Sequence, residues 1–336
     1  MIKQRTLGRT GLKVSEICLG TINFGWKTKE QESLSILDAY HAAGGNFIQG
    51  IGHCPELSLA SASTKASEEI VGKWWRSRGI PRSNLVLATR VNLGRGSEAA
   101  SLVKFARDCV RESLRRLRTS YVDLLVIEWS DSVLPSSRLI EVFNALVREG
   151  LTRYIGAADF SAWRIAEIIG RARDRNSCRM EALQSDYSLL TRARFEPEAM
   201  ALCEDQRLGF IARSPLAGGF LTQSDHLSVS RREWLDQRYG NIYGDAALAA
   251  LNDVARKHGA TPARTALAWV LHNPAVTSAV VGVQSATQLH DLLHAAFIQL
   301  SESDRNLLHN ATAVEEVRIG PDISPSSVPA AELALN

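Results

Sequence analysis

Short apolar runs alternate with longer stretches of helical periodicity along nearly the whole chain, and this alternation restricts the fold more than any other feature. In SLVKFARDCVRESLRRLR, for example, apolar side chains recur on one helical face. Such alternation is typical of βα units that build a parallel sheet. The expected strands are Glu16–Gly20, Asn46–Gln49, Leu85–Arg90, Val122–Glu128, Arg153–Ala157, Ala182–Ser185, Gly209–Arg213 and Ala279–Gly282. Eight units in about 300 residues predict a closed (β/α)8 barrel, and a doubly wound open sheet is the alternative.

The two ends of the chain depart from this pattern. RTLGRTGLKVS alternates around an Arg-Thr-Gly turn, which predicts a β-hairpin that plugs the floor of the barrel. The segment PDISPSSVPAAELALN near the C-terminus has no helical or strand periodicity. We therefore expect one barrel domain over residues 1–317 and an irregular C-terminal tail over residues 318–336.

Composition narrows the class of protein and of partner. The 336 residues are 45% hydrophobic and 22% charged, with a formal net charge of +3 and scattered basic residues, so nucleic-acid binding is not indicated. No apolar run reaches the length of about 18 residues that a membrane helix needs, and the first residues lack a signal-peptide pattern. Five cysteines without short paired spacing argue against a disulfide framework and a structural zinc site. We expect a cytoplasmic protein whose partner is a small-molecule ligand or substrate, not nucleic acid or a membrane.

The chemistry of such a barrel is expected at the carboxyl ends of its strands, which we call the mouth. Arg90 and Glu128 each end an apolar run directly and so should stand at the mouth itself. The full set of strand exits carries Thr21-Ile22-Asn23, Gln49 to Cys54, Arg90, Glu128, Ala158-Asp159, Gln184, Arg213-Ser214 and Gly282-Val283-Gln284.

Several blocks of sequence, in order, resemble the aldo-keto reductase family. They are RTLGRTGLKVSEICLGTINFG, SEEIVGKWW, YVDLLVIEWSD, SPLAGGFLT, TPARTALAWVL and AVVGVQSATQL, and the resemblance spans residues 3 to 312. It implies a reaction in which a nicotinamide cofactor gives a hydride to a carbonyl while a tyrosine supplies the proton. That tyrosine is assisted by a lysine, by an aspartate paired with the lysine, and by a histidine.

All four of these catalytic positions are substituted. The resemblance places Gln49 at the aspartate, Cys54 at the tyrosine, Arg90 at the lysine and Glu128 at the histidine. A thiol at the tyrosine position retreats by roughly 4–5 Å from a carbonyl in the usual place, beyond hydrogen-bond reach. Arginine does not give up a proton in water, and an ionised glutamate repels a developing oxyanion. Ordinary carbonyl reduction is therefore disfavoured.

Arg90 and Glu128 invite two interpretations. Their charges cancel, so we expect a bidentate ion pair across the mouth, which a barrel that has lost its reaction could retain. Alternatively, Glu128 acts as an acid or base in a non-redox reaction such as elimination or isomerisation. His53 and Cys54 are adjacent on an extended segment and point opposite ways, which disfavours a nucleophile–base pair. One histidine, one cysteine and one glutamate are weak evidence for a metal, and none is predicted.

The implied cofactor site is half retained. Gln184 matches the residue that binds the carboxamide, and the loop from Ser214 to Gly219 matches the one that wraps the pyrophosphate. Asp159 replaces an asparagine, and Arg213 replaces the aromatic residue that stacks on the nicotinamide, although an arginine could stack or attract another anionic ligand. Gln284 replaces an arginine that holds the 2′-phosphate of NADP, which makes an NADP preference doubtful. The implied cofactor-binding set is Thr21, Ile22, Asp159, Gln184, Arg213, Ser214, Leu216, Gly218, Gln284, Ser285 and Gln288.

The sequence thus predicts an aldo-keto reductase-like oxidoreductase that binds NAD(H) or NADP(H), with altered or lost carbonyl reduction. Two alternatives stay open: a lyase or isomerase that uses Glu128 and Arg90, and a non-catalytic binding or regulatory pseudoenzyme. Whether the chain is an enzyme at all is not decided by these residues.

Overall fold

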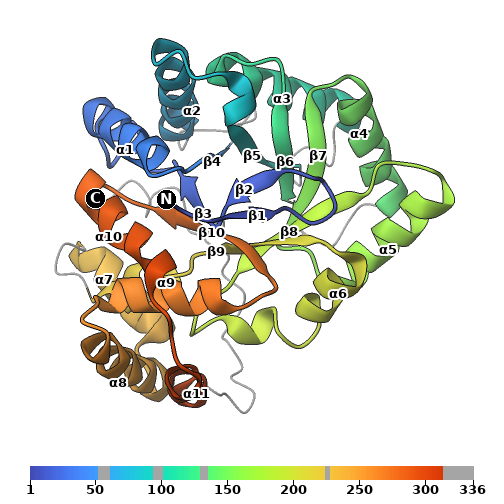
Figure 1. Ribbon diagram of the computed structural model, residues 1–336. Coiled ribbons are helices and arrows are strands. Elements are labelled where there is room, and N and C mark those ends of the chain that lie inside the picture. The colour runs from blue at the N-terminus through green and yellow to red at the C-terminus, as the bar shows by residue number, and fades with distance from the viewer. Residues whose placement is uncertain (52–60, 94–100, 129–134, 224–227, 313–336) are drawn as a thin grey trace.

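A closed barrel of parallel strands forms the centre of the molecule (Figure 1). The computed structural model describes residues 1–51, 61–93, 101–128, 135–223 and 228–312. The barrel strands are β3 (Ile17–Gly20), β4 (Phe47–Ile51), β5 (Val86–Asn92), β6 (Val122–Glu128), β7 (Thr152–Ala158), β8 (Met180–Asp186), β9 (Gly209–Arg213) and β10 (Val276–Gly282). Each pairs with its neighbour along the chain, and β10 pairs with β3 to close the barrel. The predicted barrel is confirmed, and the open-sheet alternative is wrong because the closing ladder leaves the sheet without an edge.

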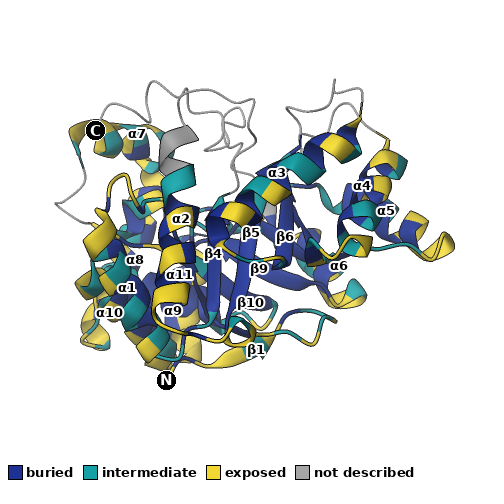
Figure 2. Ribbon diagram, turned by 90° about the horizontal axis from the view of Figure 1, so that it is seen from above, coloured by how far each residue is buried: buried dark blue, intermediate teal, exposed yellow. Residues whose placement is uncertain are grey.

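Helices surround the barrel, and α8 and α11 pack against each other outside this ring (Figures 1 and 2). Ser101 caps α3 by accepting a hydrogen bond from the Lys104 backbone, and the helix ends at Arg118 in a left-handed conformation. The α-helices are α1 (Glu30–Ala42), α2 (Ser61–Ser77), α3 (Leu102–Leu117), α4 (Ser136–Arg148), α5 (Ala162–Asp174), α6 (Ala199–Gln206), α7 (Val229–Tyr239), α8 (Ile242–Lys257), α9 (Pro262–His272), α10 (Ala286–Leu293) and α11 (Glu302–Ala311). Short 3-10 helices are η1 (Arg82–Asn84), η3 (Arg192–Arg194), η4 (Ala217–Thr222) and η5 (His294–Phe297).

The predicted N-terminal hairpin is present and plugs the barrel floor. Strands β1 (Gln4–Thr6) and β2 (Lys13–Ser15) pair antiparallel, and β1 lies below the barrel strands in Figure 2. Leu7 and Val14 are fully buried in one cluster with side chains from inside the barrel. Gly8 has a φ of +51°, and a Cβ there would lie 2.6 Å from the Gly209 backbone nitrogen. The turn therefore requires glycine to seat the plug against β9.

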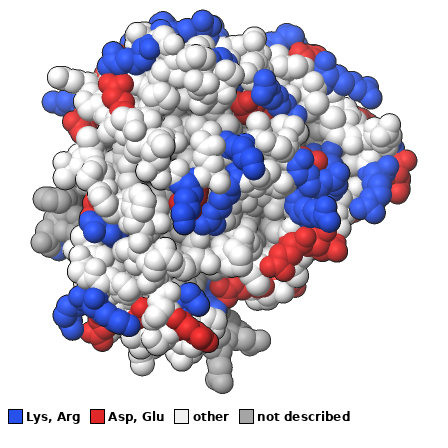
Figure 3. Space-filling view, viewed as in Figure 1, with Lys and Arg blue, Asp and Glu red and all other residues white. Residues whose placement is uncertain are grey.

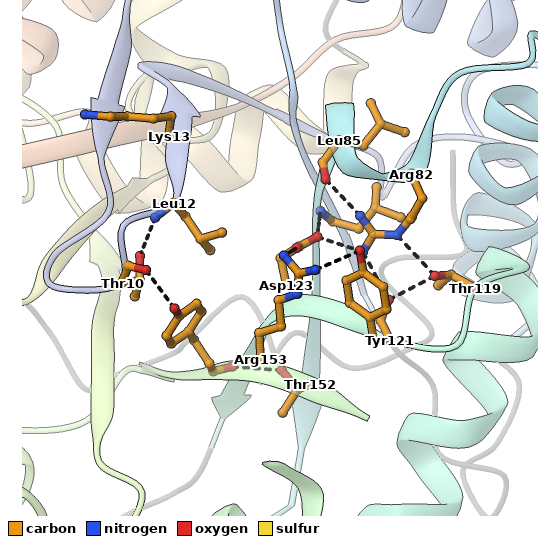
Figure 4. A network of polar contacts seen from close by, with 12 residues as sticks. Thr10, Leu12, Lys13, Arg82, Leu85, Thr119, Tyr121, Asp123, Thr152 and Arg153 are labelled. Carbon is orange, nitrogen blue, oxygen red and sulfur yellow. Dashed lines mark hydrogen bonds and ion pairs between the residues drawn. The ribbon is translucent and has the colours of Figure 1, made fainter. Parts of the chain in front are cut away.

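A network around Asp123 fixes another part of the floor (Figure 4). The buried Asp123 carboxylate accepts from Arg82 Nη2 at 2.7 Å and from the Leu87 backbone nitrogen at 2.9 Å. Arg153 forms an ion pair with its other oxygen at 3.3 Å. The two guanidinium groups lie over the Tyr121 ring, with centroid distances of 4.3 and 4.4 Å. Here, the buried carboxylate is paired with Arg82, while Arg153, which is half exposed, shares it and remains in contact with solvent.

Asp304 fastens α11 to α8, and its loss should weaken the fold. Its carboxylate accepts from Lys257 Nζ at 2.7 Å, His258 Nε2 at 2.9 Å and the Ser301 backbone at 3.0 Å. Burial alone would raise the pKa of Asp304, but these hydrogen bonds outweigh it and hold the pKa well below its usual range. We expect Asp304→Asn to lower the free energy of unfolding by about 1–3 kcal/mol at pH 7, measured by urea denaturation.

The stabilisation by Asp304 should depend on pH in a definite direction. Because the folded pKa of Asp304 lies below the unfolded value of about 3.9, its stabilisation is complete above about pH 4 and is lost as the pH falls further. The difference between wild type and Asp304→Asn should therefore shrink below pH 4. Asp253→Asn is the control, since Asp253 forms an exposed ion pair with Arg256 at 3.2 Å and should contribute less than about 1 kcal/mol. Equal losses for the two variants would contradict the assignment.

Within the described ranges, no helix is both long and apolar enough to cross a membrane. The predicted irregular tail at 318–336 lies outside the described residues. The assignment of residues 1–317 to one domain stays a prediction.

Candidate active site

The parallel strands bring their carboxyl ends to one edge of the barrel, so the predicted mouth residues gather there. Gln49 and Glu128 are buried, and Arg90 is partly buried, within β4, β6 and β5. Gln184 is buried in β8, and Arg213 is the last residue of β9. His53 and Cys54 lie outside the described residues.

Gln49 and Gln184 form a reciprocal amide pair across the barrel. Gln49 Nε2 donates to Gln184 Oε1 at 3.2 Å, and Gln184 Nε2 donates to Gln49 Oε1 at 2.8 Å. Their strands, β4 and β8, are not neighbours in the barrel order, so this pair spans the interior. Both side chains are almost completely buried, and each amide satisfies the other. Gln184, the position expected to bind a carboxamide, is thus already engaged.

Arg90 and Glu128 form the predicted ion pair, but not in the predicted geometry. Arg90 Nε lies 3.2 Å from Glu128 Oε2, and the contact lacks the alignment of a hydrogen bond. A bidentate pair across the mouth was therefore the wrong expectation. Strands β5 and β6 are neighbours, so the two side chains meet side by side along one ladder. The other carboxylate oxygen, Oε1, accepts from Asn92 Nδ2 at 3.2 Å.

Arg213 is held by two carboxylates. Its Nη1 and Nη2 donate to the two oxygens of Asp159 at 2.7 and 2.8 Å, and its Nε donates to Asp186 at 2.7 Å. Burial by itself would lower the pKa of Arg213, but Asp186 and Asp159 outweigh it and raise the pKa above its usual range. The guanidinium is therefore a fixed, neutralised group. From the sequence we expected Arg213 to be able to stack on a ring or attract an anion, and we did not anticipate that Asp159 and Asp186 would hold it.

The loop after β9 has a backbone shape suited to a phosphate. Ser214, Ala217, Gly218 and Gly219 all have positive φ, from 50° to 110°. Leu216 lies between them, and the Gly218 carbonyl accepts from Arg231 Nη2 at 3.0 Å. Positive-φ residues of this kind occur in backbone turns that bind anions, although the Ala217 and Gly219 N–H groups here donate to the Ser214 and Leu216 carbonyls at 2.9 and 3.0 Å. A Cβ at Gly218 would lie 2.7 Å from Arg231 Nη2, so any residue other than glycine at this position would require the Arg231 side chain to move.

The remaining predicted cofactor positions lie around the same end of the barrel. Thr21 is buried, with its hydroxyl 2.7 Å from Ser67 Oγ, whereas the Ile22 side chain is 42% exposed. Ser285 caps α10 by accepting from the Gln288 backbone nitrogen at 3.2 Å. Gln288 Oε1 accepts from the Gln284 backbone nitrogen at 2.9 Å. The side chains of Ser285 and Gln288 therefore already accept hydrogen bonds at the N-terminus of α10, while the Gln284 side chain is exposed.

Two residues of the mouth were not found by reading the sequence. Asp186 was placed outside the predicted strand Ala182–Ser185, yet β8 continues to Asp186. Because side chains alternate along a strand, Asp186 shares the inward face with Gln184, and this period of two was the available signal. Asn92 extends β5 in the same way, two residues after Arg90. Among the described residues, no group of three or more metal-ligating side chains is close enough to hold a metal.

The chemical capacity of the described mouth is limited by this pairing. The amides at Gln49 and Gln184 satisfy each other, and the charges at Arg90 and Glu128 cancel. Neither group at the lysine and histidine positions is suited to pass a proton to a carbonyl oxygen. At its described positions, the mouth therefore presents an amide pair and an ion pair.

Comparison with known proteins gives consistent matches. The model of the aldo/keto reductase family matches residues 16–312. The chain is 32% identical to "Uncharacterized oxidoreductase YrpG" of Bacillus subtilis, over 90% of this chain and 94% of the relative. It is 29% identical to "Protein tas" of Escherichia coli, over 93% and 97% of the two chains. It is 28% identical to "Putative voltage-gated potassium channel subunit beta" of Schizosaccharomyces pombe, over 85% of each.

Proposed function

The chain belongs to the aldo/keto reductase family and is oxidoreductase-like, and on that premise we propose that it binds a nicotinamide dinucleotide at the barrel mouth without carrying out ordinary carbonyl reduction. One observation carries this proposal. Three of the four positions that match catalytic residues of the family lie in the described part of the chain, and the side chain at each is already paired. Gln49 is hydrogen bonded to Gln184, a position expected to contact the cofactor, and Arg90 forms an ion pair with Glu128.

The residues fit the two ends of the dinucleotide unequally. The loop from Ser214 to Gly219 offers left-handed backbone at the pyrophosphate position, which supports binding at that end. At the ring end, Gln184 and Asp159 would hold the carboxamide, but each is already hydrogen bonded to Gln49 or Arg213. When bound, the nicotinamide would supply a hydride. The chain's own residues would then position the dinucleotide through its phosphates more firmly than through its ring.

The choice between NAD(H) and NADP(H) rests on Gln284. A neutral amide cannot form the charged fork that a guanidinium makes with a 2′-phosphate. The Gln284 side chain is exposed, so it would not sterically exclude a phosphate either. We propose that NAD(H) binds at least as tightly as NADP(H).

Titration of the purified protein with NADH and NADPH, followed by nucleotide fluorescence, tests the binding proposal. We expect saturable binding, weakened about tenfold or more by Gly218→Ala, because a Cβ there would press on Arg231 and disturb the loop. Gly79→Ala is the matched control: Gly79 also has positive φ, at +62°, but a Cβ there meets nothing within 4 Å. If neither nucleotide binds, the proposal fails.

A non-catalytic binding role is the second candidate, and the paired mouth favours it over a new chemistry. The S. pombe relative bears the name of a channel subunit, and a binding role needs no free acid or base. A screen of aldehydes for oxidation of NADH or NADPH separates the two candidates. Binding without turnover supports a binding protein, while turnover of common aldehydes would show that ordinary reduction survives.

A lyase or isomerase would need Glu128 as an acid or base. Both of its carboxylate oxygens are engaged, by Asn92 and Arg90, which leaves neither clearly available to a substrate. If a non-redox activity is found, Glu128→Gln decides its origin: unchanged turnover would exclude the acid–base role, and loss of about 100-fold or more would support it.

A further inference from the structure

A second hollow lies on the floor of the barrel, at the opposite end from the mouth. It has a volume of about 590 Å³ and is formed where the hairpin turn meets α5, α6 and the starts of β8 and β9. We call it the floor pocket; its lining residues are Arg9, Arg173, Arg179, Asp205, Gln206 and Arg207. Four arginines and one aspartate thus line the hollow. Figure 3 views the same side of the molecule as Figure 1 and shows that Lys and Arg side chains gather in several groups on it.

Arg179 is the fixed member of the cluster. Its Nε donates to the Met180 carbonyl at 3.1 Å and its Nη2 to the Gln206 carbonyl at 2.9 Å, and the side chain is only 15% exposed. Burial lowers the pKa of Arg179, and Arg9 and Arg173 lower it further against the opposing effect of Glu181. The three arginines are therefore close enough to repel one another.

The nearest counter-ion to Arg179 is a poor one. Glu181 Oε1 lies 3.5 Å from Arg179 Nε, longer than a good charge-assisted hydrogen bond. Its other oxygen, Oε2, is buried and has no hydrogen-bond partner among the described atoms. Burial raises the pKa of Glu181, so its charge is disfavoured rather than stabilised here.

The other three arginines are exposed at the rim. Within the described ranges, no carboxylate lies within ion-pair distance of Arg9, Arg173 or Arg207. Gly8 brings Arg9 to this place, because its positive φ lets the turn approach the Glu181 and Arg207 carbonyls, which a Cβ would meet at 2.7 and 2.9 Å. A plug that needed only to fill the floor would not require an arginine at this point.

The Asp123 network on the same floor provides a contrast. There, Arg82 and Arg153 share a buried carboxylate and both lie over the ring of Tyr121 (Figure 4). In the floor pocket, Arg9, Arg173 and Arg207 have no such carboxylate within ion-pair distance in the described part of the chain. Clustered cations that the protein itself does not neutralise are expected where a bound anion does so.

We propose that the floor pocket binds a small ligand through a phosphate or pyrophosphate group. Planar guanidinium forks match phosphate oxygens in pairs, and a group with two or more negative charges would satisfy several arginines at once. The volume is within the usual range for small-molecule sites, about 300–1,000 Å³. This site is separate from the mouth and does not depend on nicotinamide binding.

Isothermal titration calorimetry with inorganic pyrophosphate, inorganic phosphate and citrate tests the proposal on the full chain. We expect pyrophosphate to bind most tightly, with an affinity that falls as salt rises. Arg9→Gln should weaken it about tenfold or more, and Arg9→Gln combined with Arg207→Gln about 100-fold, because each removes charge-assisted hydrogen bonds. Both substituted positions are exposed, so the variants should fold.

Two control variants locate the binding site. Arg232→Gln makes the same charge change at an exposed position of α7 and should leave the affinity unchanged. Gly218→Ala alters the mouth loop, so it should affect any separate binding of pyrophosphate at the mouth but not the binding event that Arg9→Gln weakens. The proposal is overturned if no probe binds, if citrate binds as tightly as pyrophosphate, or if Arg232→Gln weakens binding as much as Arg9→Gln. It is likewise overturned if Gly218→Ala, rather than Arg9→Gln, removes pyrophosphate binding.

Discussion

Arg213→Ala is expected to lower the free energy of unfolding by about 3–5 kcal/mol at pH 7, because it leaves the Asp159 and Asp186 carboxylates near each other without their cation. Asp186 is 5% exposed and Asp159 26% exposed, so solvent can screen only part of this charge. Urea denaturation of wild type and variant at pH 7 measures the loss.

Arg213→Lys separates the charge of Arg213 from its shape. A lysine keeps the positive charge but cannot donate simultaneously in the directions of both carboxylates, as the guanidinium does. We expect a smaller loss for Arg213→Lys than for Arg213→Ala. A loss of less than about 1 kcal/mol for Arg213→Ala would mean that the triad is solvated and contributes little.

The fold could be predicted from the sequence because strand and helix periodicities are local. The predicted Gly209–Arg213 and Val122–Glu128 coincide with β9 and β6, and the other barrel strands differ by a few residues at their ends. The ion pair of Arg90 and Glu128 was predictable for a related reason. Both residues were predicted to end successive strands, and successive strands of this barrel are neighbours; Glu128 does end β6, whereas Arg90 lies two residues before the end of β5.

The rest of the site depends on distances across the barrel, which no local pattern encodes. Gln49 and Gln184 are separated by 135 positions and meet only because the barrel diameter places β4 and β8 within reach of two amide side chains. The two partners of Arg213 follow or end different strands, β7 and β8. Asp159, the partner after β7, has a left-handed backbone conformation with φ of 61°. Burial then decides which of the possible pairs forms, since unpaired polar groups are costly inside a barrel.

Restoring the family's catalytic residues should create a carbonyl reductase. The combined variant Gln49→Asp, Cys54→Tyr, Arg90→Lys and Glu128→His places a phenol, its lysine and aspartate partners and a histidine at the mouth positions. It also removes the Gln49 amide that occupies Gln184. A positioned proton donor contributes about 10²- to 10⁴-fold, so we expect NADH- or NADPH-dependent reduction of an aromatic aldehyde to rise at least about 100-fold over wild type.

The matched control carries Cys54→Phe in place of Cys54→Tyr, with the other three substitutions unchanged. It has the same ring and the same rearranged polar groups but no hydroxyl, so it should bind the nucleotide as the first variant does and remain inactive. Equal activity of the two combined variants would show that the proton comes from elsewhere, and the role proposed for the tyrosine position would be wrong. Wild-type activity equal to that of the restored variant would show that the pairs Gln49–Gln184 and Arg90–Glu128 do not prevent reduction. If the restored variant alone is active, the four substitutions account for the difference in activity, since the barrel and the loop from Ser214 to Gly219 are common to all three proteins.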